Sequence, residues 1–336
     1  MKVAVAGAGY FSQFHYDAWR RIEGVDLVGA TDLNPDALKE RAPDLPHFTD
    51  FGAMMLETRP DLIDIVTPPD THFGMIRGAV IAGAQAVICQ KPFCNDLEEA
   101  EAAVYTAEQG RMTVVVHENF RFQPWYRAAA LLIAEGVLGE VMQVTFRLRP
   151  GDGQGPEAYL DRQPYFQKMP RFLVHETAVH WVDTFRFLLG EPETVWADLR
   201  QLNPAIAGED AGIIVFGYSS GARAVLDGNR LVDHVATNRR RTMGECLIEG
   251  TRMSILIDGE GRLLTRTFGE NEWTDTELNA PESGFGGDCV YALQNHVVDA
   301  LLSGATPENT ARDYLNVIRT EQAIYKSHET GQRISL

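Results

Sequence analysis

The stretch MKVAVAGAGYFSQFHYD, residues 1–17, decides the fold of this chain. Residues 2–6 form a short apolar run, which predicts a buried strand. The run ends at Gly7, Ala8 and Gly9, and a helical pattern begins near Phe11. A strand, a glycine turn and a helix in this order suit a pyrophosphate, because glycines let the backbone approach the phosphates and the helix N-terminus offers free N–H groups.

This turn follows the dinucleotide-binding pattern G-x-G-x-x-G/A with one change. Gly7 and Gly9 fill the first two positions, and Ser12 fills the third. Serine is only slightly larger than alanine, so we expect the helix to pack closely on the strand. The residues of the turn that we expect to contact a dinucleotide are Gly7, Gly9, Tyr10, Phe11 and Ser12.

A second apolar run, residues 25–31, ends at Asp32. A carboxylate at this place suits the adenosine ribose, because it accepts from the ribose hydroxyls and repels a 2′-phosphate. This favours NAD over NADP. The alternative is that Asp32 caps the helix that begins after Asn34 and Pro35.

Composition and charge narrow the class of protein. The chain has 336 residues, of which 45% are hydrophobic and 23% charged, which predicts an ordinary globular protein of about two domains. The net charge of −17 argues against nucleic acid or an anionic membrane as a partner. A small neutral substrate is compatible with it.

The sequence also predicts a cytoplasmic location. No apolar run approaches the roughly 20 residues needed to span a bilayer. Met1 leads directly into a strand, so we expect no signal or transit peptide. The four cysteines form no CxxC pair and are expected to be free thiols in a reducing compartment, without a metal site.

Strand and helix patterns alternate through the first 120 residues. Six expected strands with crossover helices predict a doubly wound parallel sheet, an α/β fold. Ligands of such sheets bind beyond the carboxyl ends of the strands. Thr67, Pro68 and Asn119 follow strand ends and are expected to contact the cofactor; His72 is either another contact or a helix-start histidine that faces solvent.

A different pattern follows residue 120, so we expect domains at 1–120 and 121–336. Residues 150–171 form a long stretch whose aromatic residues predict a covering loop rather than disorder. Residues 173–189 read as one helix that ends at Gly190. Residues 193–277 predict a mostly antiparallel sheet, and two helices follow at 288–302 and 310–328.

The helix at 173–189 contains candidate catalytic residues. His175 and His180 are five residues apart, about 140° around an α-helix, so they diverge and do not form the HExxH zinc motif. Glu176 and His180 are four apart, about 40°, and share a face with Asp183 nearby. Glu176 is thus placed to orient His180 as an acid–base group. The alternative is a structural histidine.

Lys91 is the second candidate. It directly follows a buried strand, Pro92 restrains it, and its ammonium can donate to a substrate oxygen. The alternative, a surface lysine in a loop, is disfavoured by the apolar neighbours Val87, Ile88 and Phe93.

Taken together, these segments resemble the Gfo/Idh/MocA family of nicotinamide-dependent sugar and polyol oxidoreductases. The resemblance covers nearly the whole chain. It rests on AVAGAGYFS (4–12), TPPDTHFGMIRGAVIAGAQAVICQKPF (67–93), ENFRFQPWYRAAALLIAEGVLGEV (118–141), HETAVHWVDTFRFLLG (175–190) and AIYKSHETGQRISL (323–336).

The resemblance implies a Rossmann domain followed by an α/β domain whose open sheet mediates homodimers or homotetramers. It assigns Lys91 to the E-K-P motif, where the lysine contacts the reacting hydroxyl, and His180 to the general acid/base. Gln90 stands where glutamate is usual, and Glu176 stands where aspartate is usual. In the family a Gly-rich segment precedes the histidine helix, whereas this chain has residues 168–172 in that place. Arg171 and His175 are therefore candidate substrate contacts that are particular to this chain.

The hypothesis is an NAD-dependent dehydrogenase of a sugar or cyclic polyol. An aldose, for instance a pentose, oxidised at its anomeric carbon is the first expectation, and an inositol-type alcohol is the second. Alternatives are an NAD-using glycoside hydrolase and a non-catalytic dinucleotide-binding regulator. The expected catalytic residues are Lys91, His180 and Glu176; Arg121, Tyr159 and Arg171 join them as substrate contacts, and Gln90 and Lys91 join the cofactor contacts.

Overall fold

The computed structural model describes residues 1–336 and divides them into two compact units. The first unit comprises Met1–Asn119 and Val290–Ile318, and the second comprises Phe120–Cys289 and Arg319–Leu336. The expected domains, 1–120 and 121–336, differ from these units in one segment: the structure assigns residues 290–318 to the first unit. The chain returns to the first unit there, where Val116 donates its N–H to the carbonyl of Asn309 at 2.8 Å.

The first unit contains a six-stranded, fully parallel sheet of order β3-β2-β1-β4-β5-β6, which confirms the predicted doubly wound fold. The central strands are buried on both faces, as parallel strands covered by helices must be. The strands are β1 (Lys2–Ala6), β2 (Asp26–Thr31), β3 (His47–Phe48), β4 (Leu62–Ile65), β5 (Ala86–Gln90) and β6 (Thr113–His117).

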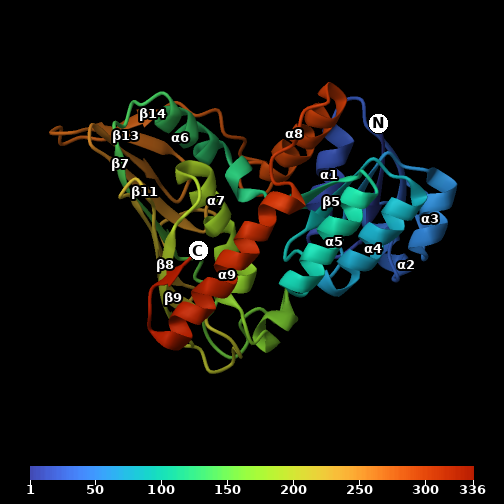
Figure 1. Ribbon diagram of the computed structural model, residues 1–336, viewed down its shortest axis with the longest axis horizontal. Helices are drawn as coiled ribbons and strands as arrows, with labels where there is room; N and C mark the ends of the chain where they lie inside the picture. The colour runs from blue at the N-terminus through green and yellow to red at the C-terminus, as the bar shows by residue number, and fades with distance from the viewer. The chain divides into compact units, whose positions relative to one another are not determined.

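The helices of this unit begin at residues that satisfy their free N–H groups. Asn34, Asp50 and Asp96 accept the backbone N–H groups that open α2, α3 and α5. In Figure 1, α4 and α5 lie side by side, and they are in contact. The helices are α1 (Ser12–Arg21), α2 (Pro35–Arg41), α3 (Phe51–Thr58), α4 (Pro69–Ala82), α5 (Leu97–Gln109) and α8 (Cys289–Ser303).

The second unit is built on a nine-stranded sheet of order β14-β13-β12-β11-β7-β10-β9-β8-β15. All neighbouring strands are antiparallel except β7 and β10, so the predicted mostly antiparallel sheet is confirmed. The strands are β7 (Val141–Leu148), β8 (Thr194–Arg200), β9 (Ala211–Gly217), β10 (Arg223–Asn229), β11 (Gly244–Gly250), β12 (Met253–Ile257), β13 (Leu263–Thr267), β14 (Thr274–Thr276) and β15 (Ile334–Ser335).

One face of this sheet is covered by helices. Alternate residues of β8 and β10 are buried, and the residues between them are half-exposed. The helices are η1 (Phe120–Phe122), α6 (Pro124–Ala134), α7 (Val179–Leu189) and, from Arg319 onward, α9 (Ala311–Thr330). The ring of Trp181 on α7 stacks on Phe146 of β7 at 4.0 Å, which places α7 against the buried face (Figure 1).

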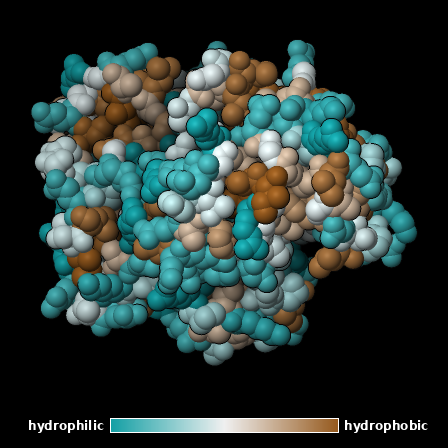
Figure 2. Space-filling model, turned by 45° about the vertical axis from the view of Figure 1, so that its right-hand side comes forward, coloured by the Kyte–Doolittle hydropathy of each residue, from teal (hydrophilic) through white to brown (hydrophobic).

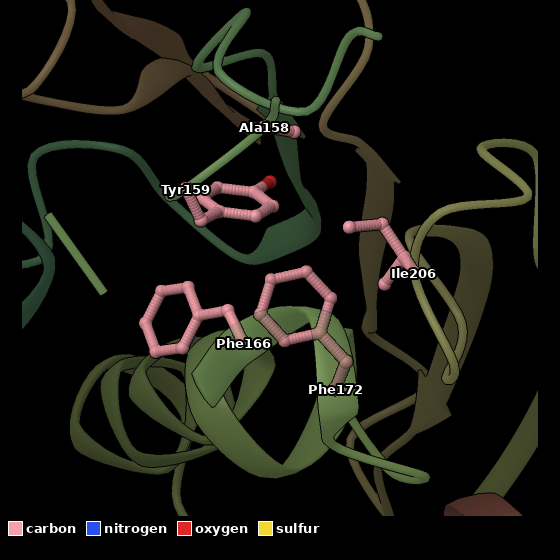
Figure 3. Close-up of a cluster of buried hydrophobic side chains, with 5 residues drawn as sticks. All are labelled: Ala158, Tyr159, Phe166, Phe172 and Ile206. Carbon is pink, nitrogen blue, oxygen red and sulfur yellow. The ribbon is translucent and has the colours of Figure 1, made fainter. Parts of the chain in front are cut away.

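The covering loop, residues 150–171, has a hydrophobic core of its own. Within it, Pro164–Lys168 form the 3₁₀ helix η2. Figure 3 shows the rings of Tyr159, Phe166 and Phe172 gathered beside Ala158 and Ile206, and all five side chains are buried. The loop is therefore ordered, because aromatic burial offsets the entropy that a long loop loses.

The expected helix at 173–189 has two parts. Leu173–Ala178 form a π-helix, η3, and α7 follows without a break. A π-helix has more residues per turn than an α-helix, so the angles of 100° per residue used above do not hold up to Ala178. The relative directions of His175, Glu176 and His180 must therefore come from their contacts.

None of the helices is long and apolar enough to span a membrane. The face drawn in Figure 2 is mostly hydrophilic, with hydrophobic residues in small groups. All four cysteines are buried free thiols, as expected.

Candidate active site

The glycine turn of the first unit leaves room for a ligand in front of its backbone. Gly7 has φ +115°, and a Cβ there would lie 2.5 Å from the carbonyl oxygen of Val66, so only glycine fits. A Cβ on Gly9 would meet nothing within 4 Å. The buried Ser12 donates its hydroxyl to the carbonyl of Gly9 at 2.7 Å. Serine in the third position therefore stabilises the turn by a hydrogen bond.

The N-terminus of α1 has no side-chain cap. Phe11 occupies the N-cap position, and no side chain there accepts from the helix. An uncapped N-terminus carries free N–H groups and partial positive charge, which suits an anion. Tyr10 is 37% exposed and Phe11 is half-buried beside this turn.

Asp32 is bound to the glycine turn. Its Oδ2 accepts the N–H of Ala8 at 2.7 Å, and its Oδ1 accepts the N–H of Asn34 at 2.8 Å. The cap of α2 is Asn34, whose side chain accepts from Asp36. The capping alternative for Asp32 is therefore wrong, and its carboxylate is held half-buried at the carboxyl end of β2.

The turn after β4 is supported from inside by His72. Thr67 is half-buried and Pro68 is exposed, whereas His72 is fully buried. Nε2 of His72 donates to the carbonyl of Thr67 at 2.8 Å. Burial lowers the pKa of His72. The expectation that this histidine faces solvent is thus wrong, and it has no exposed surface for a direct cofactor contact.

Gln90 and Lys91 lie where β5 ends. Lys91 is half-buried, and the Lys91–Pro92 peptide is cis. The side chain of Gln90 is buried; its Oε1 accepts the N–H of Lys91 at 2.8 Å, and its Nε2 lies 3.0 Å from Nε2 of His15. Gln90 thus connects the candidate catalytic lysine to the interior.

Asn119, two residues beyond β6, has an unused donor. The residue is only 2% exposed, and its Nδ2 has no hydrogen-bond partner. A buried amide N–H group without a partner is costly, and a ligand carbonyl would relieve that cost.

In the second unit, His180 is buried and stacks on Phe120 with ring centroids 3.9 Å apart. Glu176 is half-buried, and its Oε2 accepts the hydroxyl of Thr177 at 2.6 Å. Nη1 of Arg230 lies 3.8 Å from the same oxygen. The carboxylate of Glu176 is therefore held by its neighbours at the π-helix.

The other expected substrate residues have partners within the second unit. Arg121 is 8% exposed and donates to both oxygens of the fully buried Asp183, at 2.8 and 2.6 Å. Tyr159 is 3% exposed, and its hydroxyl accepts from Arg230 at 2.8 Å. These two side chains support the unit from inside, and their direct contact with a substrate stays a prediction.

Arg171 and His175 both contact α9. The guanidinium of Arg171 lies 4.3 Å from the ring centroid of Tyr325, and Nδ1 of His175 is 2.7 Å from Oε1 of Glu321. These contacts explain the placement of both side chains without a substrate. Their direct contact with a substrate likewise stays a prediction.

Sequence reasoning missed Arg230, which organises the covering loop. It is 2% exposed and binds Asp152, Tyr159 and Thr177. The signal was available: continuing the alternation of β10 by one residue puts Arg230 on the buried side. A buried arginine in a strand pattern indicates a charged partner.

His15 and Asp64 were missed as well. Both are fully buried and paired at 2.7 Å. The signal for them was a carboxylate inside the apolar run of β4, since a buried carboxylate needs a donor.

Comparison with known proteins agrees with this geometry. Residues 1–118 match the Gfo/Idh/MocA oxidoreductase family with its NAD-binding Rossmann fold, and residues 126–255 match the C-terminal domain of the same family. The chain belongs to the Gfo/Idh/MocA family. Its fold and its assignment as an NAD-dependent oxidoreductase that acts on hydroxyl groups follow from this membership.

Three known proteins illustrate what this chain is similar to. It is 29% identical to D-apiose dehydrogenase of Paraburkholderia graminis, over 100% of this chain and 89% of the relative. It is 27% identical to inositol 2-dehydrogenase of Rhizobium meliloti, over 100% and 99% of the two chains. An Agrobacterium radiobacter oxidoreductase solved with NAD⁺, L-tartaric acid and magnesium matches with TM-score 0.89 and 26% identity, over 100% and 98%.

The first unit fits the dinucleotide that its family binds. Gly9 leaves open space for a pyrophosphate, α1 lacks a cap, and Asn119 carries an unpaired amide. Of the residues expected to contact the cofactor, His72 and Ser12 have fully buried side chains that support their turns from inside, whereas Gly9 and Asp32 lie at the carboxyl edge of the sheet with exposed surface.

Proposed function

We propose that this family member is an NAD-dependent dehydrogenase that oxidises a sugar or cyclic polyol at a hydroxyl-bearing carbon. The observation that carries the proposal is Lys91, half-buried directly after β5 on the same edge of the parallel sheet as the glycine turn. An ammonium group at this edge is placed to donate to a ligand that is bound beyond the strand ends.

NAD is the proposed cofactor, in preference to NADP. The carboxylate of Asp32 is fixed by two backbone N–H groups, so its charge cannot turn away from a 2′-phosphate. Its remaining lone pairs accept from ribose hydroxyls. Leu33, which is 90% exposed, offers apolar surface beside it for an adenine. When bound, NAD supplies the hydride acceptor.

Lys91 and His180 divide the remaining chemistry. His180 accepts the proton of the substrate hydroxyl, and the Lys91 ammonium donates to the same oxygen and stabilises the negative charge that develops on it. Glu176 contacts the substrate or orients the imidazole. Thr177 and Arg230 hold the Glu176 carboxylate for that purpose.

The proposed substrate is an aldose that is oxidised at its anomeric carbon to a lactone, with a pentose as the first candidate. The similarity to D-apiose dehydrogenase over the full chain supports a pentose. The similarity to an inositol 2-dehydrogenase supports a cyclic polyol as the second candidate.

The active form is proposed to be a homodimer or homotetramer that associates through the open face of the nine-stranded sheet. Ile213 of β9 lies on that face, opposite in phase to the buried Ile214 and Phe216, and is 45% exposed. Light scattering of purified protein tests this proposal; a monomer at micromolar concentration would contradict it.

The formation of NADH, measured with NAD or NADP and a panel of pentoses, hexoses and inositols, tests the function. A clear rate with one pentose, faster with NAD, is the expected result. Silence across the panel with tightly retained NAD would contradict it and indicate a glycoside hydrolase that uses NAD transiently. Silence with freely exchanging NAD would indicate a regulator.

A further inference from the structure

A chain of buried polar groups lies behind Lys91 in the first unit. The N–H of Lys91 donates to Oε1 of Gln90 at 2.8 Å, and Nε2 of Gln90 lies 3.0 Å from Nε2 of His15. Nδ1 of His15 lies 2.7 Å from Oδ2 of Asp64. Gln90 is 9% exposed, and His15 and Asp64 are fully buried, so water does not compete for these bonds.

The direction of each hydrogen bond follows from its neighbours. Oε1 of Gln90 must accept, because the backbone N–H of Lys91 can only donate. The amide nitrogen of Gln90 is therefore the donor to Nε2 of His15. An accepting Nε2 carries no proton, so the proton of a neutral ring lies on Nδ1 and is donated to Asp64.

The other partners of Asp64 agree with its role as an acceptor. Its Oδ2 also accepts Nε1 of Trp19 at 2.6 Å and Nε2 of Gln294 at 3.1 Å. Gln294 Nε2 lies 3.2 Å from Nδ1 of His15 as well, but both carry hydrogen in this arrangement. Three donors thus converge on one carboxylate oxygen, which acts as the acceptor of all three.

We propose that Gln90 and His15 are positioning residues for Lys91. The neutral, Nδ1-protonated imidazole of His15 holds the Gln90 amide, and the amide holds the backbone of Lys91. The inference rests on the proposed role of Lys91, and it assigns a purpose to glutamine at position 90. A neutral amide can donate to an unprotonated Nε2, whereas a carboxylate cannot.

A glutamate at position 90 would require a different protonation state of the His15 ring. To bond with a carboxylate, Nε2 of His15 would have to carry a proton, so that the ring becomes an imidazolium between two carboxylates, Asp64 and the new one. The ring of His117, whose centroid lies 4.2 Å from that of His15, would face this added charge. Glutamine and the neutral histidine are thus a matched pair.

Nitrogen NMR of the full chain labelled at histidine tests the pairing, because the two ring nitrogens report their protonation separately. The His15 signal is identified by its loss in His15→Gln. The expected pattern in the unaltered protein is a neutral ring with the proton on Nδ1, and in Gln90→Glu a ring with both nitrogens protonated. The matched control Gln85→Glu, at an exposed position just before β5, leaves the neutral pattern unchanged.

Either of two NMR results overturns the proposal: an Nε2-protonated or doubly protonated ring in the unaltered protein, or a ring that stays neutral in Gln90→Glu while circular dichroism shows a folded chain. Neither result depends on catalysis. A failure of the proposed function, such as full turnover in Lys91→Met, is therefore distinguishable from a failure of the pairing between Gln90 and His15.

Turnover then tests the positioning role itself. Gln90→Ala removes the acceptor of the Lys91 N–H and should lower kcat by about tenfold or more, because a small misplacement of a catalytic group is costly. Both ends of the Gln90 amide bond within the protein rather than to the expected cofactor, so NAD affinity should change less than twofold. Gln90→Glu keeps an oxygen for that N–H and should recover part of the loss. Equal kcat in Gln90→Ala and the unaltered enzyme would refute the positioning role.

Discussion

The imidazole of His180 stacks face to face on the ring of Phe120, with centroids 3.9 Å apart and ring planes only 3° apart. Phe120 is itself held by an edge-to-face contact with Trp181 at 5.2 Å. A side chain pinned on one face by an aromatic ring cannot rotate freely about its last torsion. The nitrogen edge of His180 is therefore oriented by packing before any substrate arrives.

The first prediction concerns this stack. Phe120→Leu keeps an apolar side chain but removes the flat surface, so kcat should fall by about tenfold through misorientation of the imidazole. Steady-state kinetics at saturating NAD measure it. Phe268→Leu, at a position 77% exposed in the same unit, is the control and should match the unaltered enzyme. Unchanged kcat in Phe120→Leu would show that the stack is only structural.

The second prediction concerns the two proposed catalytic groups. Lys91→Met and His180→Ala should each lower kcat by about 10²-fold or more, since each removes a proton-transfer or charge-stabilising group. NADH binding, followed by fluorescence titration, should stay within about twofold.

The controls for these variants are Lys39→Met and His47→Ala, both at exposed positions of the first unit. They should keep full activity. If Lys91→Met and His180→Ala both retain near-normal turnover, the proposed reaction is wrong.

The third prediction concerns the choice of cofactor. Asp32→Asn keeps an oxygen that can accept from Ala8 but removes the negative charge, so kcat/KM for NADP relative to NAD should rise by about tenfold. Asp32→Ala also loses the bond to the glycine turn and should weaken both cofactors. A ratio that does not move in Asp32→Asn would show that this carboxylate does not select the cofactor.

The sequence predicts the first unit well because its signals are local. Gly7, Gly9 and the apolar runs of β1 and β4 each specify backbone geometry within a few residues. The return of residues 290–318 could not be predicted this way, because it depends on long-range bonds such as that between Asn309 and Val116.

The π-helix at Leu173–Ala178 was missed for a similar reason. A π-turn has almost no composition signal of its own, and here Glu209 from a distant segment accepts the N–H groups of Phe172 and Val174 at 3.2 and 3.0 Å. Periodicity at 100° per residue therefore gave a reasonable candidate pair, Glu176 and His180, but not its geometry.

The fourth prediction concerns Arg230, whose guanidinium joins Asp152 and Tyr159 of the covering loop to Thr177 of the π-helix. Its charge is stabilised by Asp152, and the rings of Tyr159, Phe166 and Phe172 surround it at 5.1, 5.8 and 4.9 Å. Arg230→Met keeps the apolar stem but removes the buried guanidinium that binds Asp152, Tyr159 and Thr177, while Arg162 still pairs with Asp152, so stability should fall by about 2–4 kcal/mol.

Urea unfolding measures this loss, and limited proteolysis should cut first within residues 150–171. Arg223→Met is the matched control, because Arg223 is exposed at the start of the same strand. Should Arg230→Met unfold at the same urea concentration as Arg223→Met, the guanidinium does not anchor the loop.

The fifth prediction concerns pH and His72. Burial lowers the pKa of this ring below its ordinary value of 6.5, and the carbonyl of Thr67 and the charges of Asp70 and Glu99 oppose the shift only in part. Well above pH 6.5 the ring is neutral in both the folded and the unfolded chain. Below it the unfolded chain binds a proton that the folded chain does not, so stability should fall as the pH decreases toward the folded pKa.

The variant His72→Gln separates this effect from general acid sensitivity. Glutamine reaches the carbonyl of Thr67 with an amide N–H and does not titrate, so the loss of Tm between about pH 7.5 and 5.5 should be smaller than in the unaltered protein. His47→Gln, at an exposed position, should keep the original pH dependence. Parallel Tm profiles for His72→Gln and the unaltered chain would mean that folding does not lower the pKa of His72, and would contradict the prediction.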